Sequence, residues 1–289
     1  MKYIKFMEWM WKIKMANGTL YICPTPIGNL EDITIRTLNV LNKVDLIAAE
    51  DTRHTIKLLN HYEIKKPLTS YHEHNKWEKG KFLLEKLEAG ENIALVSDAG
   101  MPGISDPGED LIREAILKKI EVIVLPGSTA SITALLLSGF PTGKFVFEGF
   151  LPSNKKDRKK ELERLKNEER TIILYEAPHR LMDLLKDMCE VLGNRRISIS
   201  RELTKIHEET FRGTIEEGIE KYRENRKGEF VIVVEGGKAE KEVPLLDIPI
   251  KEHIKLYMEN GFSKKEAIKK VSKDRDIPKN QVYKESIDL

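Results

Sequence analysis

The sequence predicts an α/β protein with two α/β domains and a small helical extension at the carboxyl end. From Thr19 onward, short apolar runs alternate with helical patterns, and after residue 143 the alternation gives way to a more mixed series of strands. Beyond Gly236 the pattern indicates helices alone. Strands that alternate with helices form parallel sheets covered on both faces. The expected divisions are an amino-terminal extension at 1–17, α/β domains at 18–142 and 143–238, and the helical extension at 239–289.

The first domain is expected to contain short, β-branched strands joined by amphipathic helices. The expected strands span residues 19–23, 45–49, 93–97 and 121–125. The expected helices span residues 33–42, 52–62, 75–87, 110–118 and 130–137. This order predicts a parallel sheet.

The second domain and the tail show different patterns. Strands are expected at 144–149, 171–175, 196–201, 209–213 and 229–235, with helices at 155–166, 178–191 and 214–225. In the tail, helices are expected at 250–260, at 264–273 and just after residue 277. Ser263 and Glu266 form the pattern of a capping box at the start of the second of these helices. Helix, turn and helix here resemble a nucleic-acid-binding unit or, equally, a small capping bundle.

Composition excludes some classes of protein and leaves others open. Of 289 residues, 40% are hydrophobic and 33% charged, and no apolar run reaches the ~18 residues of a membrane span. The net charge of +2 indicates no particular partner. Cys23 and Cys189 lack the spacing of metal ligands, which favours a reducing cytoplasm. Residues 1–14 are basic and aromatic without the features of a signal peptide, so they form either an extension or an amphipathic helix at a membrane surface.

The loop after the 93–97 strand predicts a ligand site. Residues 93–108 read IALVSDAGMPGISDPG, in which a buried strand is followed by glycines that let a ligand approach the backbone and by Asp98, a hydrogen-bond acceptor. Ligands of parallel α/β sheets bind at the carboxyl ends of strands. Loops at 24–30, 97–105, 126–130 and 176–180 all follow strands and are expected to line one cleft. Dinucleotide and P-loop fingerprints are absent from the sequence, so the expected ligand is nucleoside-like without a polyphosphate.

Six segments carry a resemblance to a known family. In chain order they read PTPIGNLEDIT, AEDTR, SDAGMPGISDPG, LPGSTA, YEAPHR and ELTKIHEE. Together they resemble the tetrapyrrole-methylase superfamily, and within it the family that methylates small-subunit ribosomal RNA. The resemblance covers residues 18 to about 236, and the tail resembles the helical extension of that family. Departures are Thr129, where the family more often has serine, and the added residues 1–14.

The resemblance implies S-adenosylmethionine as cofactor, bound in a cleft between two α/β domains, and a homodimer. The implied cofactor contacts are Pro26, Asp98, Met101, Thr129, Ala130, Glu176 and Leu203. Chemistry agrees, because Asp98 or Glu176 suits ribose hydroxyls or an amino group, and Thr129 at a helix start suits a carboxylate. Met101 and Leu203 offer apolar walls for adenine or are simply part of the core.

The resemblance also implies 2′-O-methylation of a cytidine in the decoding region of 16S rRNA. Methyl transfer is an in-line displacement in which alignment supplies much of the rate, and the hydroxyl must lose a proton. Candidates for the base or electrostatic helper are Glu50, Asp51, His179, Lys205 and Glu208, and no metal site is expected. The expected RNA contacts are Arg53, Arg180 and four lysines of a basic run, Lys155, Lys156, Lys159 and Lys160. Arg158 stands in the same run and is also expected to face solvent. Alternatively, these residues form internal salt bridges or a solvated face.

Two rival functions stay open on the sequence. One is a methylase of a small tetrapyrrole or of a modified protein residue. The other is a non-catalytic RNA-binding module for ribosome assembly, which would bind no cofactor.

Overall fold

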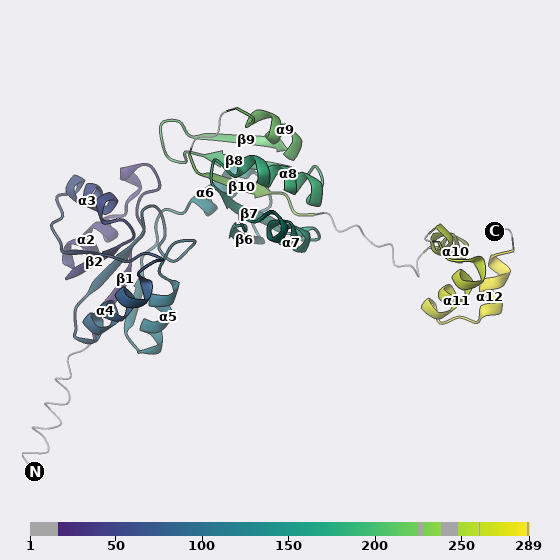
Figure 1. Ribbon diagram of the computed structural model, residues 1–289, viewed down its shortest axis with the longest axis horizontal. Coiled ribbons are helices and arrows are strands. Elements are labelled where there is room, and N and C mark those ends of the chain that lie inside the picture. The colour runs from purple at the N-terminus through teal and green to yellow at the C-terminus, as the bar shows by residue number, and fades with distance from the viewer. Residues whose placement is uncertain (1–16, 225–227, 238–247, 260, 288) are drawn as a thin grey trace, which may run out of the picture. The chain divides into compact units, whose positions relative to one another are not determined.

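The structure, a computed structural model, describes residues 17–224, 228–237, 248–259, 261–287 and 289 (Figure 1). Among these residues the chain forms two compact units, one up to residue 166 with 170–236, the other from 167–169 with the residues from 237 onward. Both β-sheets belong to the first unit. The domain boundary expected at residue 142 stays a prediction. Residues 1–16 of the expected extension lie outside the described residues.

The first sheet is parallel throughout, with the strand order β3-β2-β4-β1-β5. Its strands are β1 (Thr19–Ile22), β2 (Leu46–Ala49), β3 (Leu68–Ser70), β4 (Ile93–Val96) and β5 (Glu121–Val124). The predicted parallel sheet is confirmed. Strand β3 is missing from the predicted elements, because three half-buried residues after a proline carry no apolar run.

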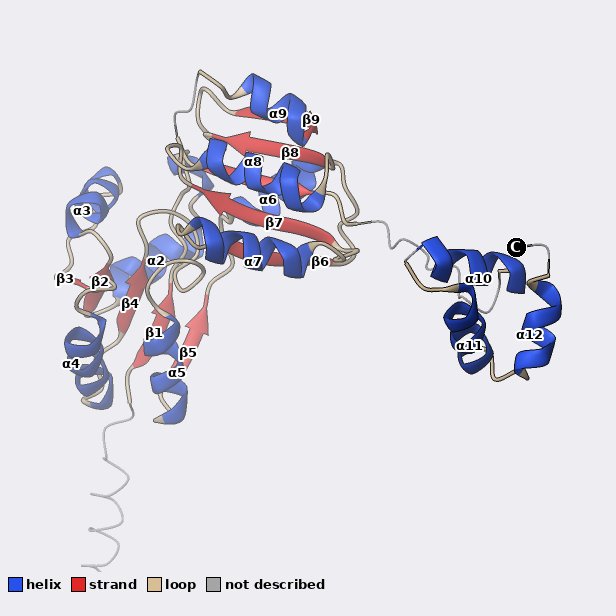
Figure 2. Cartoon of the chain, turned by 45° about the vertical axis from the view of Figure 1, so that its right-hand side comes forward, coloured by secondary structure: helices blue, strands red, loops and turns tan. Residues whose placement is uncertain are grey.

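Helices cover both faces of this sheet (Figure 2). They are α2 (Ile35–Lys43), α3 (Thr52–His61), α4 (Lys76–Glu88) and α5 (Glu109–Leu117), with a 3-10 turn, η1 (Leu30–Asp32), before α2. Ile93 and Leu95 of β4 pack in one buried cluster with Leu83 of α4, whereas Ala94 and Val96 pack in a second cluster with α2 and α3. Successive side chains of a strand point to opposite faces, so both faces of β4 are buried.

The second sheet is mixed, with the order β6-β7-β10-β8-β9. Strand β6 runs parallel to β7, and the other neighbours are antiparallel. Its strands are β6 (Phe145–Phe150), β7 (Thr171–Glu176), β8 (Arg196–Arg201), β9 (Glu209–Thr214) and β10 (Phe230–Val234). The mixed character predicted for this part of the chain is confirmed.

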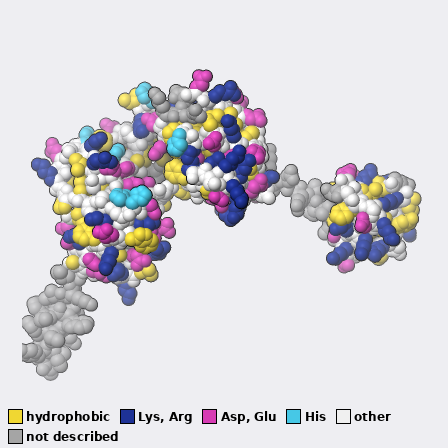
Figure 3. All heavy atoms as spheres, viewed as in Figure 1, with side chains coloured by type: hydrophobic (Ala, Val, Ile, Leu, Met, Phe, Trp, Pro, Cys, Tyr) yellow, Lys and Arg dark blue, Asp and Glu magenta, His cyan; other side chains and the backbone are white. Residues whose placement is uncertain are grey.

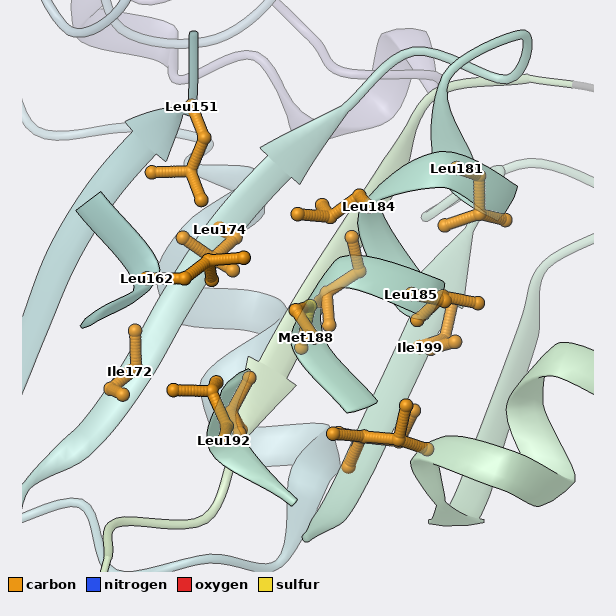
Figure 4. Packing of buried hydrophobic residues seen from close by; sticks show 14 of the residues in the cluster. Leu151, Leu162, Ile172, Leu174, Leu181, Leu184, Leu185, Met188, Leu192 and Ile199 are labelled. Atoms are coloured by element: carbon orange, nitrogen blue, oxygen red, sulfur yellow. The ribbon is translucent and has the colours of Figure 1, made fainter. Parts of the chain in front are cut away.

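One face of the second sheet carries three helices and the other face carries one. The three are α7 (Lys155–Leu165), α8 (Leu181–Leu192) and α9 (Ile215–Lys221), and the fourth is α6 (Ala130–Ser138). Leu162 of α7 and Leu184 and Met188 of α8 lie over Leu174 and Ile199 of the sheet (Figure 4). Helix α6 packs on the opposite face against β8 and β10. The apolar clusters on the two faces of this sheet hold β7 and β10 in place, and both strands contribute residues to the site described below.

The described residues of the second unit form three helices, as the tail pattern predicts. They are α10 (Ile250–Glu259), α11 (Lys264–Asp274) and α12 (Lys279–Glu285), packed around Ile254, Val271 and Val282. The capping box at α11 is confirmed, because Ser263 N donates to Glu266 Oε2 at 3.0 Å and Glu266 N donates to Ser263 Oγ at 3.4 Å. Within the described part of the chain, no helix has the length and apolar character needed to cross a membrane.

Candidate active site

Three of the four expected loops lie together at the carboxyl edge of the first sheet. Strands β4, β1 and β5 are neighbours, so the loops that follow them begin side by side. Thr25 and Gly100 exchange two backbone hydrogen bonds, of 2.9 and 3.0 Å, and Thr25 Oγ1 donates to the Ser97 carbonyl at 3.1 Å. Gly100 has a φ of +82°, a conformation that glycine adopts without strain. The loops after β1 and β4 are therefore fixed to each other.

The fourth loop, at 176–180, does not share that edge. It follows β7, which belongs to the second sheet, so the four loops do not end along one sheet edge, but Pro178 of this loop lines the same cavity as the other three loops. The second sheet also approaches through the loop after β8, which contributes Glu202, Leu203 and Lys205. A Cβ atom placed on Gly28 would lie 2.7 Å from the carbonyl oxygen of Leu203, so this close approach requires glycine.

A cavity of about 740 Å³ lies where these loops meet the second sheet. The second sheet contributes Tyr175 of β7 and Phe230 of β10 to its wall. Six of the seven expected cofactor contacts also line it, namely Pro26, Asp98, Met101, Thr129, Ala130 and Leu203. Small-molecule sites typically have volumes of ~300–1,000 Å³, with mostly apolar walls and a few placed polar groups. The cavity fits that description.

Glu176, the seventh expected contact, is fully buried and does not line the cavity. Its Oε1 accepts a hydrogen bond from Ala177 N at 2.9 Å and lies 3.1 Å from Nε of Arg180. Burial raises the pKa of Glu176, while the Ala177 amide and Arg180 oppose that rise. Arg180 also donates to the Leu151 carbonyl at 2.5 Å. Glu176 and Arg180 thus form an internal ion pair, the alternative that the sequence left open.

Asp98 is held in place from the start of α3. Its Oδ1 accepts a hydrogen bond from Asp51 N at 3.0 Å. The Asp51 carboxylate caps α3 by accepting from Arg53 N at 2.8 Å and forms an ion pair with the Arg53 guanidinium at 2.7 Å. The Arg53 side chain is 88% exposed. Asp51 is therefore engaged in a helix cap and an ion pair, and Arg53 faces solvent, where a phosphate could reach it.

The other catalytic candidates are dispersed. Lys205 lines the cavity and lies 3.0 Å from Glu202, which also lines it. Glu208 Oε2 accepts a hydrogen bond from Thr204 N at 2.7 Å, which stabilises the loop after β8. His179 is exposed in the turn after β7. Of these three, Lys205 is the one that the fold brings to the cavity.

Asp106 lines the cavity and was missed by the sequence reasoning, although it stands in the Gly-Pro-rich loop. Burial raises the pKa of Asp106 to about 7, and the charges of Glu50, Glu229 and Asp98 add to that rise. Burial, followed by the charge of Asp98, also raises the pKa of Glu50. A carboxyl group that ionises near neutral pH is suited to accept a proton. The sequence signal was weak because Glu50 and Glu229 are distant along the chain.

The basic run on α7 is partly solvated (Figure 3). Lys155, Lys156 and Lys160 are exposed, and Lys159 forms an ion pair with Glu190. Arg158 is buried, which corrects the expectation that the whole run is solvated. It lies 2.6 Å from Asp187, with the two side chains 5% and 4% exposed. The helical period turns Arg158 inward, and the partner on α8 offsets the cost of burying its charge.

No cluster of three or more His, Cys, Asp or Glu side chains suited to a metal ion occurs among the described residues. His72 and His74 lie near each other, with ring centroids 6.1 Å apart, outside the cavity lining. Cys23 is buried and Cys189 half-buried, and both are free thiols.

Comparisons with known proteins agree with this geometry. Residues 19–218 match the family described as tetrapyrrole (corrin/porphyrin) methylases. A Halalkalibacterium halodurans protein named ribosomal RNA small subunit methyltransferase I is 53% identical over 92% of this chain and 93% of its own length. A Bacillus subtilis protein of the same name is 51% identical over 93% of this chain and 94% of its own.

A solved structure supports the same fold at lower identity. The uroporphyrin-III C-methyltransferase of Thermus thermophilus, complexed with S-adenosyl homocysteine, matches with a TM-score of 0.53 and 19% identity. The match covers 75% of this chain and 97% of that one. With two thirds of its length matched by the family and with relatives above 50% identity, this chain belongs to the tetrapyrrole (corrin/porphyrin) methylase family.

Proposed function

We propose that this protein transfers a methyl group from S-adenosylmethionine to small-subunit ribosomal RNA, and that the acceptor is the ribose 2′-oxygen of a cytidine in the decoding region of 16S rRNA. The cavity carries the proposal, because its wall is built from the motif loops of the chain. Relatives at 51–53% identity, named for small-subunit rRNA methylation, support RNA as the substrate class. The expected location is the cytoplasm, where ribosomal subunits are found.

The cavity residues fit S-adenosylmethionine. Asp98 and Asp106 supply acceptors and negative charge for the hydroxyl, amino and sulfonium groups of such a ligand. The Thr129 hydroxyl makes no capping bond to α6, so it and the Ala130 amide at the start of that helix suit a carboxylate, whereas Ser131 N donates to the Tyr175 hydroxyl at 3.1 Å. Met101 and Leu203 provide apolar walls for a purine ring. When bound, S-adenosylmethionine supplies an electrophilic methyl group on a positively charged sulfur.

The chain contributes alignment and proton handling. Walls from both sheets hold the reactants at close range, and such positioning supplies a large part of the rate in displacement reactions. Asp106 lines the same cavity, and because its pKa is raised to about 7, its ionised form is available at neutral pH to accept the hydroxyl proton. Lys205, which also lines the cavity, offers a positive charge to the RNA backbone.

The test combines binding and transfer. Calorimetry should detect S-adenosylmethionine binding, and Asp98→Asn should weaken it by ~1–3 kcal/mol, the scale of losing a partner for a buried polar group. The control is Glu114→Gln, an exposed residue of α5 outside the cavity, which should leave binding unchanged. Small subunits from a strain that lacks the enzyme should accept one methyl group per 16S rRNA, mapped by mass spectrometry to a cytidine ribose.

The outcomes separate the rivals. Cofactor binding without transfer to small subunits, combined with transfer to a tetrapyrrole or a protein residue, would favour a different methylase on this fold. RNA binding without cofactor binding would favour a non-catalytic assembly module. Transfer to a base carbon or nitrogen in place of the ribose oxygen would overturn the 2′-O assignment while leaving RNA as the substrate.

Exposed apolar side chains support the proposed homodimer. Strand β5 is an edge of the first sheet, and its Val124 is 56% exposed. Helix α5, which packs beside β5, exposes Ile116 and Leu117 by 59% and 69%. Large apolar side chains beside an open sheet edge favour association. Light scattering at micromolar concentration should give twice the 33.3 kDa mass of one chain, and a monomer mass would contradict the dimer.

A further inference from the structure

A second, smaller pocket adjoins the cavity. Its volume is about 150 Å³, and it lies between the loop after β1 and helix α3, lined by Thr25, Pro26, Leu30, His54, Lys57, Leu58 and Asp98. Pro26, Leu30, His54 and Asp98 line both spaces. A ligand in the smaller pocket would therefore lie next to a ligand in the larger cavity.

Hydrogen bonds fix the walls of the smaller pocket. The Tyr62 hydroxyl, at the end of α3, donates to the Leu30 carbonyl at 2.6 Å and joins α3 to the turn that faces it. At the start of α3, Asp51 N donates to Asp98 Oδ1 at 3.0 Å. Walls that are already in place lower the entropic cost of binding. The pocket is therefore ready to receive a ligand without rearrangement of α3.

Size limits the ligand to one ring. A protein cavity of ~150 Å³ holds benzene, a single six-membered ring, so the volume suits a pyrimidine and is small for a purine. The apolar surface comes from Pro26, Leu30 and Leu58, and the imidazole of His54 offers a face for stacking. Two charged groups complete the wall, the Lys57 ammonium and the Asp98 carboxylate.

We propose that this pocket receives the flipped-out pyrimidine base of the target nucleotide and selects cytosine. This inference rests on the proposed function and adds the residues that recognise the base. Enzymes that do chemistry on a base commonly extrude it into a close-fitting pocket, and the same movement here would place the ribose of the target nucleotide beside the larger cavity. Because the two spaces share four wall residues, a base in the smaller one brings its own ribose toward the larger one.

The two charged groups match the cytosine edge. A carboxylate accepts well from the exocyclic amino group of cytosine. Asp98 lines both spaces, and its oxygen that is not bonded to Asp51 N has two lone pairs, one for the base and one for the cofactor. Lys57 can donate to the ring nitrogen or carbonyl oxygen, both acceptors. Uracil replaces the amino group by a carbonyl oxygen, which repels a carboxylate. Arg53, beside His54 on α3 and 88% exposed, is placed for the neighbouring phosphate.

Free nucleosides test the pocket independently of RNA methylation. With S-adenosyl homocysteine present at saturation to fill the larger cavity, cytidine should shift the methyl NMR signals of Leu30 and Leu58 at millimolar concentration. Uridine and adenosine should bind at least about fivefold more weakly, the lower end of the discrimination of one good base contact. Equal binding of adenosine, or shifts confined to other methyl groups, would overturn the proposal.

Variants separate base recognition from general charge. Lys57→Met should weaken cytidine binding at least about fivefold. It should leave the affinity for S-adenosyl homocysteine unchanged, because Lys57 lines the smaller pocket and does not line the larger cavity. Lys43→Met, an exposed lysine at the end of α2, is the matched control and should change neither. In subunits whose target cytidine is replaced by uridine, the variant should lose the preference of the wild type for cytidine.

The outcomes of these experiments distinguish failure of base selection, failure of the pocket assignment and failure of the proposed function. A uniform loss of methylation on both bases would make Lys57 a phosphate contact and refute base selection. Cytidine binding as expected, without methylation of small subunits, would refute the proposed function and leave the pocket assignment standing. Methylation of small subunits by an enzyme that shows no cytidine shifts at Leu30 and Leu58 would refute the pocket and leave the function standing.

Discussion

Asp106 should make the stability of the protein fall as the pH rises toward neutrality. Burial and the carboxylates of Glu50, Glu229 and Asp98 raise the pKa of Asp106 to about 7 from an ordinary value of 3.8. Tyr175 also faces this group, and a hydrogen bond from Ser97 lowers the pKa in part. Between pH 4 and 7 the folded protein therefore binds a proton that the unfolded chain has released. Stability then falls across this range and is level above it.

The magnitude follows from the difference in pKa. At ~1.4 kcal/mol per pKa unit, a rise from 3.8 to about 7 corresponds to a ceiling of ~4 kcal/mol. Because Asp106 is only half-buried and water can relax around it, we expect ~1–2 kcal/mol. Asp106→Asn removes the ionisation, so the variant should gain that much unfolding free energy relative to the wild type between pH 4 and pH 8.

Urea denaturation at pH 4, 5, 6, 7 and 8 measures the effect. Glu114→Gln on the exposed surface of α5 serves as control and should follow the wild type at every pH. The reasoning fails if the difference between Asp106→Asn and the wild type is the same at pH 4 and pH 8. It also fails if the variant loses relative stability as the pH rises, because that sign would require a pKa below the ordinary value.

Three further predictions concern other parts of the chain. Arg158→Met should lower the unfolding free energy by ~3–5 kcal/mol, because it removes the buried partner of Asp187 and leaves only Lys155 and Lys159, whose Nζ atoms lie 4.0 Å from Asp187 Oδ1. Adding Asp187→Leu should recover most of the loss in urea denaturation, and an additive second loss would contradict the ion-pair account. The second variant replaces three exposed lysines of α7, Lys155, Lys156 and Lys160, with glutamine. The slope of log binding constant against log salt concentration for the small subunit should fall by ~0.7–0.9 per lost phosphate contact, with cofactor affinity unchanged. An unaltered slope would show that these lysines are solvated and do not contact RNA. Truncation after Gly237 should keep cofactor binding by calorimetry and lose rRNA methylation, whereas full activity would show that the helical unit is dispensable.

Local patterns predicted most of the fold. Runs such as residues 93–97 are short, β-branched and bounded by turn residues, so their strands follow from backbone preference and burial. The order of strands and helices then required a parallel sheet, and the capping box at Ser263 located the start of α11. The loop at 97–105 could be assigned to a site because glycine, proline and aspartate at a strand end have a local meaning.

The composition of the cavity wall depended on contacts between distant residues. Residues 176–180 follow a strand and precede a helix, as the other loops do, yet strand pairing placed β7 in another sheet and Glu176 in an ion pair. Strand β3 exists because β2 offers it an open edge, since its own residues carry little preference. Asp106 acquires its raised pKa first from burial and then from the charges of Glu50 and Glu229, which stand 56 residues before it and 123 after it. Sequence fixes what each segment prefers on its own, whereas burial and Coulomb interactions depend on which segments meet, and that is decided by the packing of the whole chain.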